Sequence, residues 1–119
     1  MANNIAFLAT GKTYLLSVTT TSSNIAVYAD TPANQYALYN DGNHEIFVKT
    51  GSTSATTAVI PTAGAGQYGF VVPPNSRIVI TNGQANGTNP VYFAGIADTG
   101  THNLYITPGE GMSLSLIHI

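Results

Sequence analysis

The stretch YGFVVPPNSRIVITNGQANGTNPVYFAGI, residues 68–96, contains the pattern that decides the fold class. An apolar, β-rich segment ends at Pro73-Pro74, because neither proline can donate a hydrogen bond to a strand ladder. The alternation that follows places Ile78 and Ile80 on one face of a second strand. A loop rich in Gly and Asn at 82–89 then separates this strand from a third apolar segment. Short strands separated by turn residues are typical of all-β proteins.

The rest of the chain has the same organisation, with an apolar period of two and turn residues about every 8 to 12 positions. Strands are predicted at 5–9, 13–20, 24–29, 35–39, 45–50, 68–72, 76–82, 91–96, 103–107 and 112–119. No window of eleven or more residues shows a helical period. We therefore expect an all-β chain in which residues 1–119 form a single two-sheet antiparallel β-sandwich of jelly-roll type. A small closed β-barrel is the alternative.

Three connections carry specific expectations. Asn40-Asp41-Gly42-Asn43 tolerates the positive φ angles of a tight turn, so the strands on either side are predicted to form a hairpin. Residues 51–69 (GSTSATTAVIPTAGAGQYG) have low complexity and are predicted to form a long loop or an excursion at a sheet edge. Pro108-Gly109 fits the central pair of a type II turn.

Charge is the most unusual property of the composition. Only 7% of the 119 residues are charged, with three Lys and Arg and five Asp and Glu, against about 25% in ordinary domains. Such a chain lacks the basic surface for a nucleic acid partner and the polybasic segment of a membrane anchor. Without cysteine it has no disulfide and no thiolate metal site. The start, Met1-Ala2-Asn3-Asn4, does not resemble a signal peptide, so we expect a soluble product made in a cytoplasm, with no membrane partner.

Few side chains suggest catalysis. His44 and Glu45 are adjacent, and on a strand they would point to opposite faces and not share a ligand. The loop at 98–102 (DTGTH) could fold Asp98 back onto His102, but no serine lies in a nucleophile elbow to complete a triad. A single Asp-Thr-Gly also lacks the second aspartate of an aspartic protease. We therefore predict no enzymatic activity and no catalytic, cofactor-binding or metal-ligating residue.

Six tyrosines on predicted strands offer a different possibility, a stacking platform for sugars. They are Tyr28, Tyr36, Tyr39, Tyr68, Tyr92 and Tyr105. Tyrosine is also a common strand residue whose hydroxyl suits the rim of a sheet, and this second interpretation is favoured.

The low charge favours a protein with permanent neighbours, because no charged group then has to lose its water at the contact. If Ile46 and Val48 face the core, Phe47 lies on the outer face between two charged residues. The segment 115–119 (SLIHI) is apolar on both faces, which suggests a covered strand.

Three segments, EIFVKTG (45–51), VPPNSRIVITNG (72–83) and especially YFAGIADTGTHNLYITPGEGM (92–112), resemble small structural proteins of tailed bacteriophages. The resemblance covers roughly residues 35–112 and does not extend to the first 34. It implies a β-sandwich that decorates or cements the capsid shell, or that sits elsewhere in the virion, such as the neck or tail. It transfers no functional residue, because these proteins act through surfaces.

The expected function is therefore that of a capsid decoration protein on the virion surface, with the major capsid protein as its partner. A carbohydrate-binding sandwich is the alternative of a different class. Self-association is also expected, because closed cyclic symmetry uses one patch repeatedly. A trimer, which matches the threefold positions of a capsid lattice, is favoured over a dimer, which matches the twofold positions. The predicted interface residues are Phe47, Tyr92, Leu114, Leu116, Ile117 and Ile119.

Overall fold

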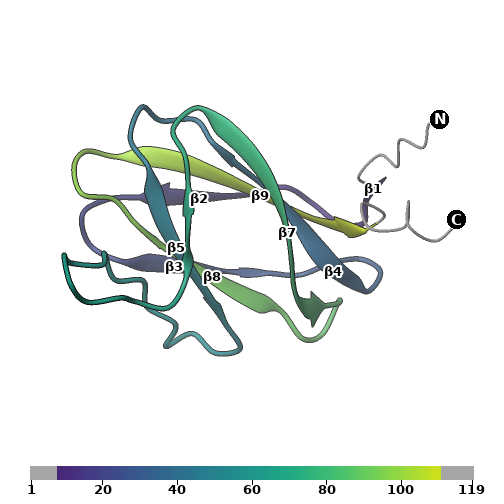
Figure 1. The fold of residues 1–119 in the computed structure, drawn as a ribbon. Coiled ribbons are helices and arrows are strands. Elements are labelled where there is room, and N and C mark those ends of the chain that lie inside the picture. Colours follow the sequence, from purple (N-terminus) through teal and green to yellow (C-terminus); the bar gives the residue numbers. More distant parts are fainter. Residues whose placement is uncertain (1–7, 111–119) are drawn as a thin grey trace, which may run out of the picture.

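The computed structural model describes residues 8–110, which form two antiparallel sheets packed face to face as a sandwich and no closed barrel (Figure 1). The strands are β1 (Leu8–Ala9), β2 (Tyr14–Val18), β3 (Ser23–Val27), β4 (Ala33–Asn40), β5 (Ile46–Gly51), β6 (Phe70–Val72), β7 (Ser76–Ala85), β8 (Val91–Ile96) and β9 (His102–Glu110). The predicted all-β sandwich is confirmed. The predicted strand at 112–119 lies outside the described residues.

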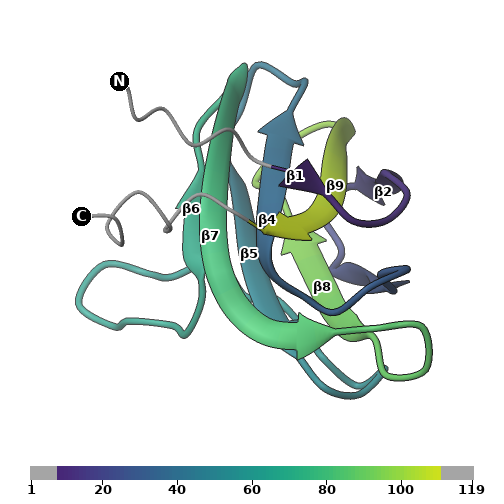
Figure 2. The same cartoon turned by 90° about the vertical axis from the view of Figure 1, so that its right-hand side faces the viewer.

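The strand pairings form a nested series. β2 pairs with β9, β3 with β8, β4 with β7, and β5 with β6, all antiparallel. The chain is thus one long two-stranded ribbon, and successive pairs of strands alternate between the two sheets. β4 also pairs with β9, and β5 also pairs with β8. These pairings join the strand pairs of the ribbon into two continuous sheets. The resulting orders are β2-β9-β4-β7, with β1 also beside β9, and β3-β8-β5-β6 (Figure 2). This rolled ribbon is a jelly roll.

The core lies between the sheets and is built from alternate residues of each strand. Its largest fully buried side chains include Tyr36, Leu38, Ile46, Phe93, Leu104 and Ile106. The rings of Tyr36 and Phe93 meet edge to face across the sandwich, with centroids 5.1 Å apart. Ile78 and Ile80 pack against this cluster, as the alternation of their strand predicts.

The predicted hairpin between β4 and β5 is wrong, because these strands belong to different sheets. The chain does reverse at residues 41–45, but it crosses the sandwich there. Buried Asn40 holds this crossing: its side-chain amide donates to the carbonyl oxygens of His44 (2.8 Å), Val72 (3.2 Å) and Pro73 (3.1 Å). Its oxygen accepts a hydrogen bond from the Gly42 amide at 2.8 Å. Turn residues predict a reversal, but they do not determine which strands pair.

The predicted turn at Pro108-Gly109 is also wrong, because both residues lie inside β9. Pro108 pairs with Tyr36, and its carbonyl oxygen accepts a hydrogen bond from the Thr10 amide at 3.0 Å. Proline has no backbone N–H group to donate a hydrogen bond. It is tolerated in β9 because the Pro108 carbonyl oxygen still accepts a hydrogen bond from the neighbouring segment.

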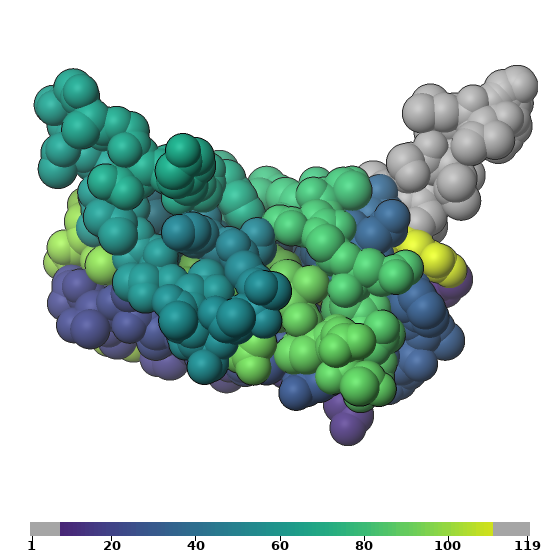
Figure 3. Space-filling view, turned by 90° about the horizontal axis from the view of Figure 1, so that it is seen from below, coloured from purple at the N-terminus to yellow at the C-terminus, as the bar shows by residue number. Residues whose placement is uncertain are grey.

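The long loop predicted between β5 and β6 is confirmed, and it contains one isolated bridge between Thr62 and Ala65. Figure 3 shows part of this loop, in teal, projecting beyond the body of the sandwich at one end.

Tyr36 gives the core a predictable response to alkaline pH. Its hydroxyl lies 2.5 Å from the carbonyl oxygen of Gly83, to which it donates, and burial raises its pKa from 10.0 to about 12. Because the native state retains this proton above the pH at which an unfolded chain releases it, this stabilisation is complete below pH 10. It decreases between pH 10 and 12, by about 1.4 kcal/mol per pH unit.

Tyr36→Phe is expected to remove this decrease and to cost about 1 kcal/mol at neutral pH through the lost hydrogen bond. Urea unfolding of both proteins at pH 8, 10 and 11 measures the two effects. An equal loss of stability in the variant between pH 10 and 11 would contradict this assignment.

Candidate functional site

A surface rich in apolar side chains lies beside β6, the outer strand of the four-stranded sheet, which among residues 8–110 pairs with β5 alone. Tyr68 is 87% exposed, Val59 48% and Val71 44%. Together with partly buried Phe47 they line a shallow hollow of about 50 Å³, all of whose lining residues are uncharged. We call these four residues the β6 edge surface. It combines exposed apolar side chains with a strand edge that has no partner strand among the described residues.

The loop between β5 and β6 is anchored in a way that leaves Val59 and Tyr68 exposed. The amide of buried Ala58 donates to Ser22 Oγ at 2.9 Å. The side chain of Asn24, on β3, donates to two loop carbonyl oxygens, of Ser54 at 3.0 Å and Thr56 at 3.1 Å. At the far end of the loop Gly69 has a φ of 129° and touches the backbone of β5 where a Cβ would collide. The sequence GQYGF therefore positions Tyr68 outside the core.

The predicted interface residues are placed as follows. Ile46 and Val48 are buried and Phe47 faces outward, as predicted. Tyr92 on β8 is also partly exposed, and it lies opposite Gly51 of β5 while Phe47 lies opposite Ile96. Phe47 and Tyr92 therefore share the outer face of one sheet.

Leu114, Leu116, Ile117 and Ile119 lie outside the described residues. The sequence interpretation missed Val59 and Val71 as surface residues, and it assigned Tyr68 to a strand. The adjacent glycines around Tyr68 were a signal that it lies in a loop.

A tyrosine pair lies on the outer face of the other sheet. The rings of Tyr39 and Tyr105 have centroids 6.1 Å apart and are inclined by 30°. They border a hollow of about 150 Å³ that Arg77 and Thr107 also line. Tyr36, by contrast, is completely buried. The six tyrosines therefore do not share one surface, but the rings of Tyr39 and Tyr105 lie side by side.

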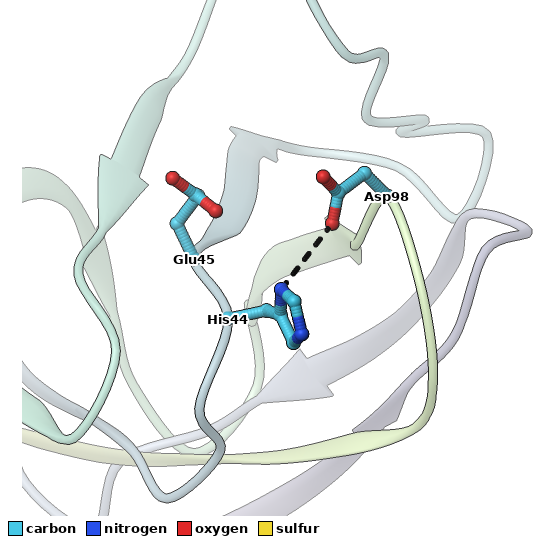
Figure 4. Close-up of side chains that lie close together, drawn as sticks. All are labelled: His44, Glu45 and Asp98. Carbon is cyan, nitrogen blue, oxygen red and sulfur yellow. Dashed lines mark ion pairs between the residues drawn. The ribbon is translucent and has the colours of Figure 1, made fainter.

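A corner of the molecule brings together His44, Glu45 and Asp98 (Figure 4). One possible ligand atom of each residue lies within 4.8 Å of the others, and His44 Nδ1 is 3.9 Å from Asp98 Oδ1. The expectation that His44 and Glu45 point apart is wrong, because both residues precede β5 and strand alternation does not apply to them. Asp98 meets His44 rather than His102, whose Nε2 lies 2.7 Å from the Thr99 carbonyl oxygen.

A larger hollow, of about 440 Å³, lies beside the end of β5 and is lined by Thr50, Asn82, Asn89 and other uncharged residues.

No helix among residues 8–110 is long and apolar enough to cross a membrane. Comparisons of the chain with protein-family models, with curated proteins and with solved structures found no match.

Proposed function

We propose that this chain is a non-enzymatic structural protein of a tailed-bacteriophage virion, a capsid decoration protein that binds and stabilises the assembled shell of major capsid protein. The β6 edge surface is the observation that carries the proposal. Its side chains are apolar or uncharged, and it lies beside an edge of β6 that has no partner strand among the described residues. The sequence resemblance to small phage structural proteins supports the same assignment.

In this proposal the protein binds the capsid shell through uncharged surface. Burial of apolar surface contributes about 25 cal/mol per Å² before the costs of association are subtracted. The residues that line the hollow of the β6 edge surface are uncharged, so docking into it removes no charged side chain of that lining from water. Glu45 and Lys49, two positions before and after Phe47 in the chain, would lie at the border of this contact. Backbone groups on the unpaired edge of β6, apart from the Val72 carbonyl oxygen that accepts from Asn40, can also pair with a strand of the partner.

Self-association belongs to the same proposal. A trimer on the local threefold positions of the shell would use the outer face that Phe47 and Tyr92 share, together with residues 114–119. Light scattering of the purified chain measures this oligomeric state.

The proposal predicts that the double variant Tyr68→Ser, Val71→Ser loses at least about tenfold in affinity for capsids, because two exposed apolar side chains leave the contact. Co-sedimentation with empty capsids assembled without this protein measures the effect. Leu15→Ser is the matched control, since Leu15 is 50% exposed on β2 in the opposite sheet. Capsid binding that is equal in all three proteins would contradict the assignment of the β6 edge surface. Binding to isolated necks or tails but not to capsids would move the protein to that part of the virion.

The Tyr39–Tyr105 pair favours a second candidate, a carbohydrate-binding module. Exposed aromatic rings beside a polar rim, here Arg77 and Thr107, can stack on sugar rings and hydrogen-bond their hydroxyl groups. A glycan array separates the two candidates: glycan binding that Tyr39→Ala abolishes, without affinity for capsids, would replace decoration by sugar recognition.

A further inference from the structure

Two connections that cross between the sheets meet at one corner of the sandwich. Residues 41–45 lead from β4 to β5, and residues 97–101 lead from β8 to β9. The chain contains only five carboxylates and three histidines. These two connections nevertheless hold three of the carboxylates, Asp41, Glu45 and Asp98, and they bring Glu45 and Asp98 together with His44 (Figure 4). A concentration of metal-ligating groups in such an uncharged chain calls for a chemical explanation.

The geometry is close to that of a zinc site. Zinc bonds to nitrogen and oxygen are about 2.0–2.2 Å long, so neighbouring ligand atoms in a tetrahedral site lie about 3.4 Å apart. His44 Nδ1 and Asp98 Oδ1 are 3.9 Å apart, and one possible ligand atom from each of the three residues lies within 4.8 Å of the others. The side chains of His44 and Asp98 are 41% and 55% exposed, which leaves them room to close by small rotations. Their exposure also leaves the fourth position open to water.

Neighbouring residues hold His44 in place. The His44 ring packs on the ring of His102, with centroids 5.5 Å apart, and His102 is only 7% exposed. The Nε2 atom of His102 forms a hydrogen bond with the Thr99 carbonyl oxygen. Gly42 lies so close to the His102 ring that a Cβ atom at position 42 would collide with it. The backbone of His44 is held by the amide of Asn40. A ligand fixed in this way needs little ordering when a metal binds.

The charge balance also favours a cation. Two carboxylates face one imidazole, and among residues 8–110 no lysine or arginine forms an ion pair with either of them. A divalent ion would offset their mutual repulsion.

We propose that His44, Glu45 and Asp98 bind a zinc ion that joins the two crossing connections. A nitrogen ligand with two carboxylates suits zinc, whereas Ca²⁺ requires six to eight oxygen ligands and Mg²⁺ prefers oxygen alone. The ion would link the end of β8 to the start of β5 and so stabilise this end of the sandwich. The proposal is independent of the partner to which the protein binds.

The test uses the full chain, treated with a chelator and then titrated with ZnCl₂. We expect one zinc ion per chain by calorimetry, and an increase in Tm of about 10 °C at a hundredfold excess over Kd. MgCl₂ should give no such increase. His44→Ala and Asp98→Asn should each weaken zinc binding at least tenfold and abolish most of the increase in Tm.

Asp30→Asn is the matched control, because Asp30 is an exposed carboxylate that precedes β4, at the end of that strand far from the corner. This variant and His118→Ala should bind zinc as the unchanged chain does. The proposal is overturned if zinc neither binds nor raises Tm, or if binding persists at full strength in both His44→Ala and Asp98→Asn.

Discussion

Replacing Asn40 by alanine is expected to lower the free energy of unfolding by about 3–4 kcal/mol. The side chain is completely buried, and it joins the end of β4 to the connection that follows it and to the carbonyl groups of Val72 and Pro73. Its removal leaves those carbonyl groups and the Gly42 amide without their hydrogen bonds, each at a cost of about 1–3 kcal/mol when the group stays away from water. Chemical denaturation at neutral pH measures the loss.

Asn24→Ala is the matched control for this variant. Asn24 also donates from its amide to two carbonyl groups, but it is exposed, so water can replace both bonds. We expect a loss below about 1 kcal/mol there. Asn40→Asp should be as harmful as the alanine variant, because a carboxylate cannot donate to the three carbonyl oxygens. Equal losses at positions 24 and 40 would show that burial of Asn40 is not what makes its bonds important.

Phe93→Ala is expected to destabilise the protein by about 3–5 kcal/mol, the usual cost of removing a buried phenylalanine side chain. Phe93 is fully buried on β8, an inner strand of its sheet, and its ring contacts Tyr36 of the opposite sheet. The alanine variant therefore loses a contact between the two sheets as well as packing within the sheet of β8. Urea unfolding midpoints, compared at constant m-value, measure it.

Phe93→Leu provides the graded control, with an expected loss of about 1–2 kcal/mol, because leucine keeps most of the apolar volume. If the alanine and leucine variants lose the same amount, the cavity left by the ring does not determine the cost. The edge-to-face contact with Tyr36 would then account for the effect.

Local pattern in the sequence predicted much of the fold, because strand alternation is a local property. The segment at 91–96 was predicted with its correct bounds, and the burial of Ile46 and Val48 followed from the period of two. Strand partners could not be predicted in the same way. The Asn-rich turn after β4 is compatible both with a hairpin and with a crossing between sheets. The contacts of Asn40 with residues 72 and 73, which lie far along the chain, are part of the crossing.

Local pattern likewise predicted some residues of the candidate sites and not others. Phe47 could be placed on an outer face because its two neighbours are strongly apolar. The exposure of Val59 depends on the anchoring of a long loop by Ser22 and Asn24, which no local pattern encodes. The cluster around His44 was missed because β5 begins at Ile46, so the rule used to separate two adjacent side chains did not apply.

The nested pairing of the strands also has a kinetic consequence. Among the described strands, β5 and β6 are the only partners that follow one another in the chain, and the ribbon pairs β4–β7, β3–β8 and β2–β9 enclose them one after another. The ribbon can therefore zip outward from that innermost pair, and each further step must bring together segments with a longer separation in sequence. Because rates of folding fall as contacts become less local, this domain should fold on the slow side for its size. The last described strand, β9, lies between β4 and the first two described strands, so this part of the larger sheet is completed only when β9 pairs.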